Sequence, residues 1–393
     1  QRKFKFCIKL SSNDWEQRKL NEIADKVSEK NKNNEFSEPF TNSAEQGIIS
    51  QKDYFDREIV NNENLNGYYI VRNDDFIYNP RISATAPVGP INRNRLGRNG
   101  VMSPLYTVFR THDIDNLYLE FYFKTTKWHR FMKLNGDSGA RFDRFTISST
   151  QFMEMPIPYP TLEEQQKIGE YFESLDTLIT LHQRKCEETK KLKKFMLQKM
   201  FPKKGEKVPE IRFGGFTDDW EQRKFGEIVE KYEDPVETPT EGYTRLGIRS
   251  HAKGTFHSYV EKGKELETAK MFRVAADKFI VNITFGWEHA VAITDENDAG
   301  KLVSHRFPQY SFNAGMEPKF FRYLILDENF KHHLELSSPG GAGRNRVLKL
   351  SDMLQYKMNF PSDAEQKKIA AYFDNLDHLI TLHQHKQNNL KNI

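Results

Sequence analysis

The sequence is poor in cysteine and has no long apolar run. Its two cysteines, Cys7 and Cys186, stand far apart and outside any metal-ligand spacing. This argues against a disulfide framework or a zinc site and is typical of a reducing cytoplasm. No apolar stretch approaches the roughly 18 residues of a membrane span, and the start, QRKFKFCIKL, has no apolar core of a secretory signal. We therefore expect a cytoplasmic protein without a membrane segment.

Motifs for nucleotide and hydrolytic chemistry are also missing. The chain has no G-x-x-x-x-G-K-[ST] loop, H-E-x-x-H pair or G-x-S-x-G turn. "YNPRI" at 78–82 is a partial match to the N-P-P-aromatic box of adenine methyltransferases, but it lacks the second proline and the aromatic residue. We interpret it as a turn after a strand. The sequence thus predicts no catalytic residue, no metal site and no cofactor in this chain.

Two strings of residues occur twice in the 393-residue chain. DWEQRK begins at residues 14 and 219, and residues 160–186 match residues 361–387 at 16 of 27 positions. Nearly equal offsets indicate the tandem duplication of a whole module. The sequences between these strings diverge, which is typical of a protein that varies what it binds while keeping how it is assembled. The initial residue is not Met, so we expect further residues before Gln1.

The segment repeated near the end of each module predicts a long helix. Thr161 with Glu164, and Ser362 with Glu365, match the capping-box pattern at a helix start. Inward positions with heptad spacing follow in each copy: Ile168, Phe172, Leu175, Ile179 and His182, then Ile369, Phe373, Leu376, Ile380 and His383. We expect the two helices to pair as an antiparallel coiled coil, with the histidines packed in the seam rather than forming a binding site. The apolar stripe is wider than a seam, which indicates further packing partners.

The expected fold is mixed α/β (α+β), with two recognition domains in tandem and two long helices in a pseudo-twofold duplicated chain. Short β-branched and aromatic runs in the divergent parts predict strands. The expected divisions are a first domain at 1–157, a first long helix at 158–204, a linker at 205–217, a second domain at 218–358, and a second helix at 359–393 that we expect to be cut short.

Arginine and lysine in Gly- and Asn-containing loops are the candidate binding residues. The net charge is only +4, so a polyanion must be bound by local patches. Gly and Asn let the backbone approach a phosphate, and Arg and Asn can form paired hydrogen bonds with guanine and adenine. The candidates for DNA contact are Arg81, Arg93, Arg95, Arg98, Arg141, Arg144, Arg245, Arg249, Lys253, Arg306, Arg344, Asn345 and Arg346.

Together these motifs resemble the specificity subunit of type I restriction–modification systems. The matching pieces are the DWEQRK entries, the P-[TS]-x-x-E-Q-x-K-I helix starts and the D-x-L-I-T-L-H-Q stretches. The resemblance implies that each domain binds one half of a split, asymmetric target in double-stranded DNA, with the helices setting the gap. It implies two methyltransferase subunits that carry S-adenosylmethionine and flip out an adenine, and restriction subunits that use ATP and Mg²⁺.

Two other classes of function remain open on sequence grounds. A coiled-coil scaffold with protein-binding end domains would explain the helices but not the two divergent Arg-rich interiors. A self-sufficient modification or cleavage enzyme would need a cofactor loop and a catalytic box that the sequence does not contain. DNA binding with a steep salt dependence would distinguish the recognition subunit from the scaffold.

Overall fold

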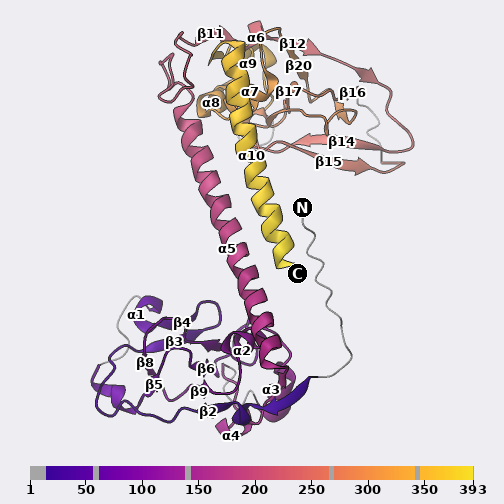
Figure 1. Cartoon of the computed structure of the whole chain (residues 1–393). Coiled ribbons are helices and arrows are strands. Elements are labelled where there is room, and N and C mark those ends of the chain that lie inside the picture. The colour runs from indigo at the N-terminus through magenta and orange to yellow at the C-terminus, as the bar shows by residue number, and fades with distance from the viewer. Residues whose placement is uncertain (1–14, 56–61, 138–142, 265–269, 341–345, 393) are drawn as a thin grey trace. The chain divides into compact units, whose positions relative to one another are not determined.

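A computed structural model describes residues 15–55, 62–137, 143–264, 270–340 and 346–392 (Figure 1). The chain divides into two compact units, residues 1–178 and 179–393. Within the described ranges, no helix is long and apolar enough to cross a membrane. The mixed α/β architecture predicted from the sequence is confirmed in both units.

The first unit is built around a four-stranded antiparallel sheet in the order β2-β9-β6-β7. Two further strand pairs, β3–β4 and β5–β8, complete its β-structure beside β1–β10. Its elements are β1 (Glu16–Lys19), η1 (Leu20–Glu22), β2 (Ala24–Lys26), β3 (Phe40–Ser43), β4 (Gly47–Ser50), α1 (Gln51–Tyr54), η2 (Asn62–Gly67), β5 (Tyr69–Val71), β6 (Phe76–Tyr78), β7 (Ile91–Arg93), β8 (Gly100–Met102), β9 (Thr107–Thr111), α2 (Asn116–Phe123), α3 (His129–Asn135), α4 (Ser149–Met153), β10 (Pro156–Tyr159) and the start of α5 (Leu162–Lys199).

The second unit repeats this plan despite its divergent sequence. Its four-stranded sheet has the order β12-β20-β17-β18, and a five-stranded sheet has the order β13-β16-β19-β14-β15. Its elements are β11 (Glu221–Lys224), α6 (Phe225–Ile228), β12 (Val229–Tyr232), β13 (Pro235–Val236), β14 (Tyr243–Ile248), β15 (Thr255–Val260), β16 (Met271–Arg273), β17 (Lys278–Val281), η3 (Gly286–Glu288), β18 (Val291–Ile293), β19 (Leu302–Ser304), β20 (Gln309–Phe312), α7 (Pro318–Leu324), α8 (Glu328–Leu336), α9 (Leu350–Met353), β21 (Lys357–Phe360) and α10 (Asp363–Lys391).

The repeated string DWEQRK forms the strand that closes each domain. Its EQRK portion is β1 in the first copy and β11 in the second. These strands pair antiparallel with β10 and β21, the strands that lead into the long helices. The string therefore ties the entry of each domain to its exit. Its tryptophans behave differently in the two copies: Trp220 is buried against Phe201 and Phe320, whereas Trp15 is 43% exposed.

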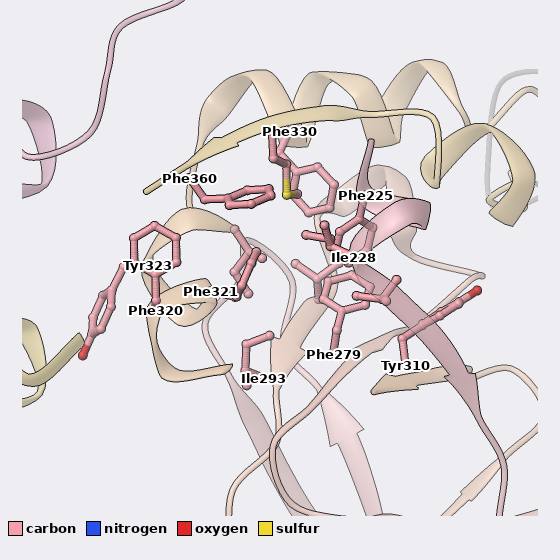
Figure 2. Close-up of a cluster of buried hydrophobic side chains, with 14 of the residues drawn as sticks. Phe225, Ile228, Phe279, Ile293, Tyr310, Phe320, Phe321, Tyr323, Phe330 and Phe360 are labelled. Carbon is pink, nitrogen blue, oxygen red and sulfur yellow. The ribbon is translucent and has the colours of Figure 1, made fainter. Parts of the chain in front are cut away.

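Aromatic side chains fill the core of the second domain (Figure 2). Phe225, Phe279 and Phe330 form a ring cluster in which the centroids of Phe225 and Phe279 are 4.8 Å apart. All three are fully buried. Buried aromatic rings contribute both apolar area and edge-to-face contacts of about 0.5–1.5 kcal/mol per pair. This core holds the helices α7 and α8 against the central sheet.

The predicted antiparallel helix pair is found within the second unit. There, α10 runs beside the later part of α5 (Figure 1). His182 Nδ1 lies 3.0 Å from His383 Nδ1, and Lys193 Nζ lies 2.5 Å from Asp377 Oδ1. The contacts run in opposite directions along the two helices, and the equivalent histidines of the duplication meet each other, as expected for packed seam residues.

The first part of each predicted seam packs on its own domain instead. Ile369, Phe373 and Leu376 are buried in the core of the second domain, where the Phe373 ring lies 4.8 Å from Tyr323. In the first unit, Phe172 contacts Phe121 at 5.4 Å, and Ile168 packs against the domain core. The prediction of one continuous seam was therefore wrong for these turns, because a heptad stripe fits a domain surface as well as a partner helix. Leu175, Ile179 and Ile380 lie partly buried farther along the helices.

A duplicated glutamine, which the sequence interpretation overlooked, anchors each long helix to its domain. Gln165 is fully buried; its side-chain amide donates to Pro160 O and accepts from Asp115 N. Gln366 makes the same two contacts with Pro361 O and Glu317 N. Because Asp115 and Glu317 are the N-caps of α2 and α7, one side chain fixes two helix starts.

The predicted capping boxes form only in part. Thr161 Oγ1 accepts from Glu164 N at 3.3 Å, but Ser362 makes no side-chain capping bond. The carboxylate of Glu365 is bound instead by the guanidinium of Arg212 through two hydrogen bonds of 2.7 and 2.8 Å. A charged guanidinium is a stronger donor to the carboxylate than the N-cap backbone amide that the capping box would have offered.

Candidate nucleic-acid interface

Both domains carry the same turn at the end of a central strand. After β6, the side chain of Asn79 accepts from Arg81 N at 2.9 Å; after β17, Asn282 accepts from Thr284 N at 3.0 Å. The middle residue of each turn accepts a backbone hydrogen bond from a loop later in the chain. Phe145 N donates to Pro80 O in the first domain, and Leu348 N donates to Ile283 O in the second. Such Asx turns are local side-chain-to-backbone bonds that fix a loop. "YNPRI" is therefore a structural turn, as its sequence predicts.

In the second domain, this turn gathers four loops, which we name the second-domain loop cluster: residues 249–254, 283–289, 304–307 and 346–348. His251 N and Ala252 N donate to Glu288 O and His289 O, and Ile283 N donates to Arg306 O. The Glu288 carboxylate also accepts from Ser250 Oγ. Backbone bonds thus hold residues from distant parts of the domain at one place, as a recognition surface requires.

Basic side chains of the second-domain loop cluster have no carboxylate partners within the described ranges. Arg249, Lys253 and Arg306 are exposed, and Arg306 Nη1 bonds only to Thr284 Oγ1 at 3.2 Å. The Arg249 guanidinium bonds to Thr255 O and lies 5.3 Å from the Phe256 ring. Arg346 lies 5.5 Å from the centroid of the Trp287 ring. These cations remain available for an external anion.

Three predicted arginines of the first domain have internal partners instead. Arg93 and Arg95 both pair with Glu120, at 3.0 and 2.7 Å, and Arg95 also reaches Glu173 on α5 at 2.8 Å. Arg98 makes two hydrogen bonds of 2.8 Å with Glu38, and this contact lowers the pKa of the Glu38 carboxyl. Their charge is neutralised within the fold, which favours a structural role for this cluster.

The remaining predicted residues fall in three groups. Arg81 and Arg144 face each other in a backbone bridge beside the Asn79 turn, and Arg81 is exposed. Arg245 lies on β14, opposite Ser258 and away from the hairpin tip. Arg141, Arg344 and Asn345 lie outside the described residues. The turn in the first domain thus holds Arg81 where the second domain has Thr284.

Sequence reasoning overlooked Trp287, Glu288 and Thr284, which form the centre of the second-domain loop cluster. A selection of basic residues alone could not include them. A usable signal was present, because FGW follows a predicted strand that matches DFIYN of the first copy, and the Asn of each strand end is shared. Aligning Asn79 with Asn282 would have placed the following residues in the equivalent turn.

Comparison with known proteins gives a consistent family assignment. The family model "Type I restriction modification DNA specificity domain" matches residues 12–191 and 217–392. The MjaVIII type I restriction enzyme specificity subunit of Methanocaldococcus jannaschii is 25% identical over 308 residues, covering 73% of this chain and 70% of the relative. A putative MjaX specificity subunit of the same organism is 28% identical over 250 residues, covering 60% of this chain and 56% of that relative.

A solved structure supports the fold. The type I restriction–modification S subunit from M. genitalium aligns with a TM-score of 0.53 at 12% identity, covering 98% of this chain and 95% of that one. Its similarity concerns the arrangement of the chain alone. The family model, by contrast, matches each copy of the duplication separately and covers most of the sequence. The chain therefore belongs to the type I restriction–modification specificity family, whose members are the non-catalytic DNA-recognition subunits of their systems.

Proposed function

We propose that the two domains bind the two halves of a bipartite, asymmetric DNA target, one half-site each. The observation that carries this proposal is the common turn at Asn79 and Asn282 with different residues around it. A shared frame keeps each surface in place, while Arg81 in one copy and the second-domain loop cluster in the other offer different donors. Different donor patterns select different base edges, so the two half-sites differ in sequence.

The long helices set the distance between the half-sites in this proposal. In support, α5 is a single helix of 38 residues, about 57 Å long at 1.5 Å per residue. The pairing of α10 with α5 is locked by Lys193, whose ammonium binds the Asp377 carboxylate; Asp377 also accepts from Tyr323 Oη. Burial and hydrogen bonds to Asp374 and Asp377 raise the pKa of Tyr323 far above its usual range, so this hydroxyl remains a donor.

Exposed apolar residues support docking of methyltransferase subunits on each half of the chain. Leu134 and Leu336 lie in the last turns of the equivalent helices α3 and α8 and are 74% and 70% exposed. Further large apolar side chains are exposed along the long helices: Leu178, Leu181, Leu192, Phe195 and Leu379. Apolar side chains that recur at equivalent positions of a duplicated chain are suited to two copies of one partner. S-adenosylmethionine would bind in these partners, and ATP with Mg²⁺ in restriction subunits, all in the cytoplasm.

Mapping methylated adenines in a host with and without this chain tests the proposal. The expected result is a bipartite motif that is modified only when the chain is present. Removing one heptad from α5 and the matching heptad from α10 shortens the pair by about 10 Å. The spacer of the motif should then change while both half-site sequences stay the same. An unchanged spacer would contradict the role of the helices, and a motif independent of the chain would contradict the proposed function.

A further inference from the structure

Arg346 and Trp287 form a cation–π pair in the second-domain loop cluster. The guanidinium carbon lies 5.5 Å from the centroid of the indole ring. Both side chains are partly buried, and the indole N–H is buried without a hydrogen-bond partner among the described residues. Arg346 has no ion pair with a carboxylate in those same ranges, in contrast to Arg93, Arg95 and Arg98.

The position of the ring is fixed by the fold on both sides. Trp287 lies in η3, where the neighbouring Gly286 packs so closely on Leu348 that an added Cβ would approach within 2.9 Å. Glu288, on its other side, accepts from Ser250 and from the backbone of His251. Leu348 is only two residues from Arg346. Its close packing on Gly286 therefore brings the backbone of Arg346 near η3, which contains Trp287. The backbone on either side of Trp287 is therefore held in place, which limits where its ring can lie.

A guanidinium held beside an indole ring is suited to a base more than to a phosphate. The contact with the ring restricts the side chain, so the guanidinium can present its two parallel donors to guanine O6 and N7. A phosphate contact needs a positive charge within reach and places little demand on the orientation of the plane, so lysine can replace arginine there. Restricting the side chain in this way would bring little advantage to a phosphate contact.

We propose that Trp287 positions Arg346 for a guanine contact, and that this pair determines one base pair of the second half-site. Trp287 acts through Arg346 and is a positioning residue, whereas Arg346 touches the base. Arg306 donates a hydrogen bond to Thr284 of the Asn282 turn. Its positive charge would lie beside the DNA phosphates next to the contacted base. This inference rests on the proposed function, because it assigns a role within the surface that binds the second half-site.

The test uses the chain assembled with its methyltransferase subunits and the motif mapped for the unchanged chain. Short duplexes carry that motif with each base pair of the second half-site replaced in turn. Arg346→Lys should weaken binding to the unmodified motif by roughly 5- to 150-fold and remove the preference at one guanine. Trp287→Phe should keep most of that preference, and Trp287→Ala should lose it. Lys262→Ala, an exposed residue paired with Glu241 on the same domain, is the matched control.

Specific outcomes would overturn the inference while leaving the proposed function intact. One is an Arg346→Lys variant that binds all duplexes as the unchanged chain does. Another is an equal loss on every duplex, with a smaller dependence on salt, which would assign Arg346 to a phosphate. Thermal unfolding of each assembled variant checks that Trp287→Ala is folded; if it is not, Arg346→Lys decides alone. If the unchanged chain directed no methylated motif at all, that result would contradict the proposed function itself.

Discussion

The two domains share a hairpin that differs in length and charge. In the first, β3 and β4 are joined by the short turn Ala44–Gln46; in the second, β14 and β15 are joined by the six-residue tip Arg249–Gly254, which holds Arg249, His251 and Lys253. Each hairpin also makes a parallel pairing with another strand of its domain. Pro39, just before β3, pairs with Val101 of β8, and Arg245 of β14 pairs with Leu302 of β19. The two domains thus differ at this loop tip on a common frame, and loop tips are where recognition residues are usually found.

The same comparison extends to the start of the long helices. Glu365 is 1% exposed and bound by Arg212, whereas its duplicate Glu164 is exposed at the start of α5. Duplicated sequence therefore does not imply duplicated contacts. The copies share the contacts of the buried glutamines but differ at this glutamate.

The ion pair between Arg212 and Glu365 should be the largest difference between the copies. Arg212→Ala leaves the buried Glu365 carboxylate without its partner, which costs about 3–5 kcal/mol for a buried pair. Chemical denaturation should show this loss in the free energy of unfolding. Glu164→Ala, at the exposed duplicate of Glu365, should alter it by less than about 0.5 kcal/mol. Equal effects at both positions would show that the copies are anchored alike.

The buried glutamines should behave alike in the two copies. Gln165→Ala and Gln366→Ala each leave the backbone N–H of Asp115 or Glu317 without an acceptor. Each should lower the free energy of unfolding by about 1–3 kcal/mol. The exposed Gln166 serves as the control, with an expected change within about 0.5 kcal/mol. A large effect in only one copy would contradict the shared anchoring.

Arginines of the first domain should separate into two kinds. Arg81 is exposed in the turn and has no carboxylate partner within the described ranges, so Arg81→Ala should weaken DNA binding by about 1 kcal/mol or more. Arg98→Ala removes a charge already paired with Glu38 and should leave affinity and the methylated motif unchanged. Binding to duplexes of the mapped motif distinguishes them. A stronger effect of Arg98→Ala would mean that its ion pair opens on DNA.

The histidine contact in the helix pair should give the smallest effect. Burial and the neighbouring His182 lower the pKa of His383 below its usual value of 6.5. The unfolded chain therefore binds a proton more readily, and the contact loses stability as the pH falls through 6.5. The free energy of unfolding of His383→Gln should fall slightly less between pH 7.5 and 5.5 than that of the unchanged chain. His378→Gln, on the exposed face of α10, should match the unchanged chain; identical slopes for all three would contradict the prediction.

Much of the architecture could be predicted from the sequence because the duplication is visible in it. The repeated strings marked where each domain begins, where each long helix starts and the seam in which His182 and His383 lie. The burial of Trp220 but not Trp15 could not be predicted, since it depends on Phe201, which the segment after α5 supplies to the second domain. Likewise, the heptad spacing could not reveal that Phe373 packs on Tyr323 of its own domain.

The candidate site was predicted less well, because charge alone does not show whether a cation is already paired. Arg93, Arg95 and Arg98 look as free in the sequence as Arg306, yet their carboxylate partners come from residues as distant as Glu38 and Glu173. Trp287 and Glu288 carry no positive charge and were missed, although they organise the second-domain loop cluster. Only the three-dimensional contacts separate the two sets.

Each domain should recognise its own half-site independently of the other. Replacing residues 218–358 with the same region of another family member, followed by mapping of methylated adenines, examines this independence. We expect the half-site recognised by the first domain to stay the same, the second half-site to change to that of the donor, and the spacer to be kept. A change in both half-sites, or in neither, would contradict the claim.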